Sequence, residues 1–172
     1  MGVTLKDEKI IDRWSMIVES GQGQAEKIYQ DTENNIKESK APGIKIERTK
    51  VRPGWLKGLL GKEREYMMVT NEALRDYRMF IGARDFGDNL DISWFITCEP
   101  GFFKKRLSNI LTSGASDKAL SLNLDIFQQQ DLNAYGTVVH HCLLKAIEKL
   151  MISLGQDSSK IDRKSKGFLG IS

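Results

Sequence analysis

Residues 77–97 read YRMFIGARDFGDNLDISWFIT, and this stretch decides the fold class. Apolar side chains alternate with polar ones before and after the sequence Phe86-Gly87-Asp88-Asn89, which is typical of a tight turn. In an extended strand, alternation places every second side chain on the same face of a sheet. The stretch therefore predicts a β-hairpin with one buried face.

Three other stretches alternate in the same way, and each predicts one strand: Ile44 to Val51, Arg64 to Thr70, and Leu122 to Ile126. Turn residues separate the strands before residue 98, and no helical pattern lies between them. Antiparallel connections are then the simplest topology. The sequence predicts an antiparallel sheet of four to five strands.

Two stretches have helical periodicity. From Asp7 to about Ser39, apolar or small residues recur in steps of three and four, which predicts a long N-terminal amphipathic helix, bent or broken near Gly21 and Gly23 and ended by Pro42-Gly43. From Asp131 to Gly155, a wide apolar stripe predicts a C-terminal amphipathic helix. The expected fold is therefore α+β, with the sheet packed against both helices.

The alternation and the apolar stripe together predict one core. Residues from the hairpin, the last strand and the final helix are expected to be buried against one another: Ile81, Trp94, Ile96, Leu124, Val139, Cys142, Ala146 and Leu150.

Composition is that of an ordinary globular protein, with 172 residues, 40% hydrophobic and 28% charged. We expect a single domain over residues 1–158 and a basic, loosely held tail over residues 159–172. No apolar segment opens the chain, and no uncharged run approaches the ~20 residues of a membrane-spanning helix, which predicts a cytoplasmic protein. Cys98 and Cys142 lie in apolar stretches without metal-binding spacing, so we expect two reduced core cysteines.

Motifs of known chemistry are not complete. The sequence GQGQAE at Gly21 lacks the third glycine and the strand-to-helix turn of a dinucleotide site, and GWLKGLLGKE has Glu63 where a phosphate-binding loop needs Ser or Thr. No zinc, calcium or nucleophile motif is present. We predict no cofactor and no metal, and we favour a non-enzymatic protein.

His140 and His141 allow two interpretations. Successive helical residues point about 100° apart, so they cannot converge with Cys142 on one metal ion. His140 is either a histidine at the boundary of the core or a general base oriented by Asp125 or Asp131. The first interpretation is favoured.

Positive charge is unevenly distributed, since residues 40–64 carry eight Lys or Arg and two Glu. Two segments follow Pro-Gly with aromatic residues and then cations, a pattern that suits an anionic surface but also suits packing. The candidate binding residues are Arg52, Trp55, Leu56, Lys57, Lys62, Phe102, Phe103, Lys104, Lys105 and Arg106.

The leading hypothesis is a binding or scaffold domain that contacts an anionic partner, either a membrane surface or an acidic protein. One alternative is a small-molecule or enzymatic cavity between sheet and helices, lined by Met68, Tyr77, Met79, Trp94 and Tyr135. A second alternative is nucleic-acid binding, since basic residues are interleaved with aromatic ones. Self-association is also expected, because the long first helix offers more apolar surface than one small sheet covers.

Overall fold

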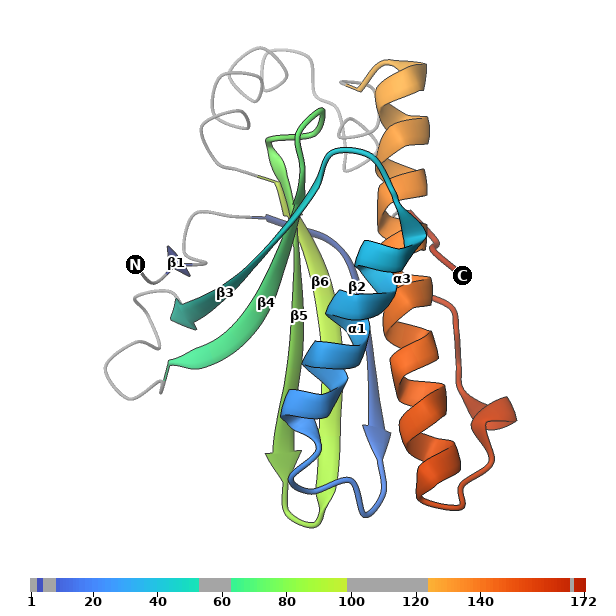
Figure 1. Ribbon diagram of the computed structural model, residues 1–172. Helices are drawn as coiled ribbons and strands as arrows, with labels where there is room; N and C mark the ends of the chain where they lie inside the picture. The colour runs from blue at the N-terminus through green and yellow to red at the C-terminus, as the bar shows by residue number, and fades with distance from the viewer. Residues whose placement is uncertain (1–2, 5–8, 53–62, 99–123, 168) are drawn as a thin grey trace.

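A computed structural model describes residues 3–4, 9–52, 63–98, 124–167 and 169–172, in which helices α1 and α3 lie on one face of a twisted sheet (Figure 1). The strands are β1 (Val3–Thr4), β2 (Lys9–Val18), β3 (Ile44–Arg52), β4 (Arg64–Asn71), β5 (Tyr77–Phe86) and β6 (Asn89–Cys98). The helices are α1 (Ala25–Ser39), α3 (Ile126–Ser153) and the short 3₁₀ helix η3 (Ser158–Lys160).

Strand order in the sheet is β1-β3-β4-β5-β6-β2. The five longer strands pair antiparallel, and β1 lies parallel to β3 at one edge. The predicted hairpin is confirmed, because Phe86 pairs with Asn89 and Gly87 adopts a φ of 63° in the turn. The α+β class and the antiparallel sheet are therefore confirmed.

The prediction of a long N-terminal helix is wrong. Its first half is strand β2, which pairs with β6 in a register that places Trp14 opposite Trp94. The chain turns at Ser20 and Gly23, whose φ values are 52° and 78°, and only then enters α1. Pairing with β6 buries Asp12, Trp14 and Val18 on one face, and this outweighs the helical spacing.

The predicted last strand is also wrong in its described part. Asp125 caps the N-terminus of α3, and its carboxylate accepts a hydrogen bond of 2.8 Å from the backbone N–H of Gln128. The Gln128 side chain accepts one of 3.3 Å from the Asp125 N–H in return, which completes a capping box. The helix thus begins at Ile126, before the expected Asp131; residues 121–123 lie outside the described residues.

The core lies between the sheet and the two helices, as expected. Seven of the eight predicted core residues belong to one buried cluster, and Leu124 is partly buried against it. Cys98 and Cys142 are both free and buried.

Residues 159–172, expected to be a loosely held tail, contribute the buried side chains Ile161, Ser165 and Ile171. The chain leaves the lower end of α3 and returns alongside that helix (Figure 1). None of the described helices is long and apolar enough to cross a membrane.

A candidate binding cleft between two arms of the sheet

The sheet divides between β4 and β5. Pairing between these strands stops at Met67 and Ile81, although β4 begins at Arg64 and β5 continues to Phe86. Over the same stretch β4 remains paired with β3, and β5 remains paired with β6. One arm, formed by β3 and β4, curves away from the other, formed by β5, β6 and β2 (Figure 1).

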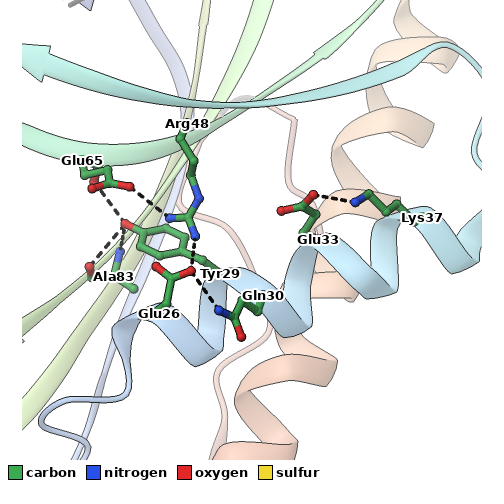
Figure 2. A network of polar contacts seen from close by, with 8 residues as sticks. All are labelled: Glu26, Tyr29, Gln30, Glu33, Lys37, Arg48, Glu65 and Ala83. Atoms are coloured by element: carbon green, nitrogen blue, oxygen red, sulfur yellow. Dashed lines mark hydrogen bonds and ion pairs between the residues drawn. The ribbon is translucent and has the colours of Figure 1, made fainter.

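The hydroxyl of Tyr29 takes the place of the next pair of backbone hydrogen bonds. Continuing the register, Glu65 would face Ala83. Instead, the Tyr29 oxygen, which α1 carries into the gap, accepts a hydrogen bond of 2.9 Å from the Ala83 N–H. It lies 3.1 Å from the Glu65 carbonyl oxygen and 3.3 Å from that of Ala83, and its one proton is donated to one of these two (Figure 2). Burial raises the pKa of Tyr29, so this proton stays in place at neutral pH.

Gly82 lies beneath the ring of Tyr66. A Cβ atom at this position would lie 2.6 Å from Cε1 of Tyr66, so the Tyr66 ring needs a glycine beneath it. Tyr66 also makes edge contacts with Phe80 and Phe95, at centroid distances of 6.5 and 5.4 Å. These ring contacts connect β4 with β5 and β6 next to the interrupted part of the ladder.

Arg48 packs against Tyr29, Glu26 and Glu65 beside the gap. Its guanidinium carbon lies 3.7 Å from the centroid of the Tyr29 ring. Its nitrogens lie 3.0 Å from a Glu26 carboxylate oxygen and 3.5 Å from one of Glu65 (Figure 2). A guanidinium group of the protein is thus held between an aromatic ring and two carboxylates.

The gap forms an open cleft of about 420 Å³. Four carboxylates and two guanidinium groups line it, together with the two tyrosines: Glu26, Glu63, Glu65, Asp91, Arg64, Arg84, Tyr29 and Tyr66. Arg84 pairs with Asp91 at 2.8 Å. Within the described part of the chain, no three His, Cys, Asp or Glu side chains are grouped to hold a metal ion.

His140 is a structural histidine. Its Nδ1 accepts a hydrogen bond of 2.9 Å from the Trp94 indole N–H, so its Nε2 carries the proton and donates to the Arg163 carbonyl at 2.6 Å. Burial lowers the pKa of His140, which keeps the ring neutral. Asp131 and Asp125 are nine and fifteen residues earlier on α3, which at ~1.5 Å per residue is ~14 and ~22 Å along the axis. The general-base interpretation is therefore wrong.

The five residues expected to line a cavity do not enclose one together. Tyr77, Met79, Trp94 and Tyr135 are buried in the core, whereas Met68 is only half-buried. Adjacent β4 residues point to opposite faces, so Met68 lies away from the buried Met67 and Val69. Tyr135 also borders a second open cleft of about 360 Å³, but its hydroxyl donates to the Val69 carbonyl at 2.6 Å.

Of the ten predicted binding residues, only Arg52 is described; Trp55, Leu56, Lys57, Lys62, Phe102, Phe103, Lys104, Lys105 and Arg106 lie outside the described residues. The two segments leave the sheet at opposite ends, because β3 ends at Arg52 and β6, antiparallel to β5, ends at Cys98. Ten residues of β6 span ~33 Å.

Part of the excess positive charge of residues 40–64 is balanced by acidic side chains, since Lys45 pairs with Glu72 at 2.9 Å and Arg48 pairs with Glu26.

Comparison with known proteins gives no relative for this chain. No protein-family model matches it, and neither a curated protein nor a solved structure does.

Proposed function

We propose that the protein is a binding domain, and that the cleft between the two arms of the sheet binds a small organic cation, an amine or a guanidinium compound. The observation that carries this proposal is the environment of Arg48, whose guanidinium group contacts the Tyr29 ring, Glu26 and Glu65. A ligand cation in the adjoining cleft meets the same chemistry.

The carboxylates keep the capacity to bind a second cation. The side chains of Glu26 and Glu65 are 64% and 56% exposed, so their contacts with Arg48 do not enclose them. An ionised carboxylate accepts about four hydrogen bonds, which leaves acceptor positions open to the cleft. Tyrosine rings add attraction for a cation over their faces. A volume of about 420 Å³ also lies within the range of small-molecule sites.

Calorimetric titration with butylguanidinium is expected to show binding, while the neutral analogue butylurea is expected to bind more weakly. Glu65→Gln should weaken butylguanidinium binding about two- to fivefold, the usual effect of losing one exposed ion pair. Glu33→Gln is the matched control, because Glu33 lies farther along α1 and pairs with Lys37 outside the cleft (Figure 2). Equal affinity for butylurea, or an equal loss in Glu33→Gln, would contradict the proposal.

We also propose that the two basic-aromatic segments contact an anionic partner, a membrane surface or an acidic protein. The sequence supports this through apolar side chains beside cations, since burial of apolar surface and attraction to anionic groups act together. Because the segments leave opposite ends of the sheet, each is expected to act separately. The first of the two segments follows β3, which ends at Arg52.

Co-sedimentation with phosphatidylserine vesicles at low salt tests this second proposal. We expect binding that is lost as the ionic strength rises above physiological, because exposed charges are then screened within about 8 Å. Lys104→Glu/Lys105→Glu and Lys57→Glu/Lys62→Glu should each weaken it. Binding to polyglutamate but not to vesicles would favour an acidic protein, and binding to single-stranded DNA alone would favour nucleic acid. Absence of all three contradicts the proposal.

Self-association and a cytoplasmic location stay predictions. A long first helix does not support self-association, since residues 9–18 form β2.

A further inference from the structure

The cleft between the two arms is lined by side chains from both faces of the sheet. Adjacent residues of a strand point to opposite faces. Glu65 therefore shares the helix-covered face with the buried Met67, whereas Arg64 and Tyr66 point to the far face, away from α1 and α3. All three of Arg64, Glu65 and Tyr66 line the cleft. A ligand in the cleft can therefore meet different groups on the two faces.

The helix-covered side of the cleft is acidic. Glu26 and Tyr29 reach it from α1, and Glu65 reaches it from β4 (Figure 2). Both carboxylates are more than half exposed although they contact Arg48. This is the side to which the proposed function assigns the cation.

The far side of the cleft has hydrogen-bond donors that are not in use. Ser93 on β6 lies opposite Gly82, the glycine beneath the Tyr66 ring, and cross-strand partners point to the same face. Among the described residues, the Arg64 guanidinium and the hydroxyls of Tyr66 and Ser93 have no hydrogen-bond or ion-pair partner. Arg84 differs, because it pairs with Asp91. Three donors thus remain for an acceptor in the cleft.

A carboxylate is the anion that suits these donors. A guanidinium group can donate two parallel hydrogen bonds to the two oxygens of a carboxylate, and each hydroxyl can donate one more. Four carboxylates against two guanidinium groups leave the lining with an excess of negative charge. A carboxylate with one negative charge is therefore better tolerated than a phosphate group with two.

We infer that the cleft binds a zwitterion, a small carboxylic acid with a guanidinium or amino group at its other end. The cationic end lies against Glu26 and Glu65, and the carboxylate accepts hydrogen bonds from Arg64, Tyr66 and Ser93. This inference rests on the proposed function, because it adds a second contact to the same ligand.

Calorimetric titration with 3-guanidinopropionate, 4-guanidinobutyrate and 5-guanidinopentanoate tests the inference, with each acid compared with its own terminal amide. Three chain lengths are used so that one can span the two faces. At least one acid should bind about three- to fivefold more tightly than its amide, the usual effect of one exposed ion pair. The amide has a net positive charge, which the acidic lining favours. A preference for the acid therefore reports a local contact with its carboxylate.

Arg64→Gln should reduce this acid-to-amide ratio of affinities to about one. Arg75→Gln is the matched control, because it also removes one exposed positive charge and should leave the ratio unchanged. Arg75 lies between β4 and β5 at the end away from the cleft, where its side chain donates to the Glu72 carbonyl at 3.3 Å.

The outcomes separate the inference from the proposed function. If butylguanidinium binds more tightly than butylurea but every amide binds at least as tightly as its acid, the zwitterion is wrong and the cation site stands. A preference for an acid that persists in Arg64→Gln, or that Arg75→Gln removes equally, would also overturn the inference. If no guanidinium compound binds, the proposed function and the inference are both wrong.

Discussion

Replacing Trp94 with alanine is expected to lower the free energy of unfolding by about 3–5 kcal/mol, the usual cost of removing a large buried aromatic side chain. Trp94 is 1% exposed and lies in β6 opposite Trp14, where it also contacts His140 edge-on at 5.5 Å. Alanine leaves a cavity in the middle of the core. It also removes the hydrogen-bond donor to Nδ1 of His140, which is buried.

Urea denaturation followed by circular dichroism measures this loss. Phe86→Ala on the same hairpin is the control, because Phe86 is 60% exposed at the turn and its truncation should cost less than about 1 kcal/mol. Trp94→Phe separates the two contributions, since it keeps most of the volume and loses the indole N–H. A loss below 1 kcal/mol for Trp94→Ala would show that β6 does not pack against α3 as described.

Tyr29→Phe is expected to lower the free energy of unfolding by about 1–3 kcal/mol, although the substitution removes only one oxygen atom. The Ala83 N–H donates to that oxygen in the gap between the arms, and without it the N–H is left buried and unpaired. The Glu65 carbonyl, 3.1 Å away, loses a donor at the same time. The effect should be concentrated where the ladder is interrupted.

Amide exchange at Ala83, measured together with urea denaturation, tests this prediction. Exchange at Ala83 should become faster, while exchange at Ile81, which still pairs with Met67, should not. Tyr135→Phe is a matched control: its hydroxyl bonds the Val69 carbonyl, and Val69 keeps its place in the ladder opposite Met79. If Tyr29→Phe lowers the free energy of unfolding by no more than a few tenths of a kcal/mol and exchange at Ala83 is unchanged, the hydrogen bonds of the Tyr29 hydroxyl do not stabilise the fold.

The hairpin of residues 77–97 was predictable because alternation and turn residues agree over its whole length. Strand β2 was not, because Ile10, Trp14 and Ile17 are spaced in steps of three and four, as on a helix. In the sheet, Ile10 and Ile17 are each 48% exposed, and Trp14 is buried only because β6, some 80 residues later, lies beside it. A local pattern cannot report a partner so distant in the chain.

The start of α3 carried a local signal that alternation obscured. Leu122, Leu124 and Ile126 alternate with polar residues, which favours a strand. Asp125 followed three residues later by Gln128 is a capping-box pattern, and it marks the helix start that the structure shows. Two local rules competed here, and the capping rule was correct.

The cleft was not predictable in its detail. Gly82 inside a strand pattern is a signal of close approach, and Tyr66 occupies the space above it. Nothing near Tyr29 in the sequence indicates that its hydroxyl bonds Ala83, 54 residues away. Counting charges over residues 40–64 also misled, because the carboxylates that pair with Lys45 and Arg48 lie outside that window.

The carboxylate of Asp12 also constrains the order in which the chain can fold during synthesis. Asp12 is made well before its hydrogen-bond donors Ser165 and Leu169, which follow 153 and 157 residues later. Until they emerge from the ribosome, the carboxylate keeps only the Arg13 N–H as a donor, and burying it with so few partners is unfavourable. The hairpin of β5 and β6 and most of α3 are available first. We expect β2 to complete the sheet only when residues 161–171 are present, as a late step that brings these two distant segments together.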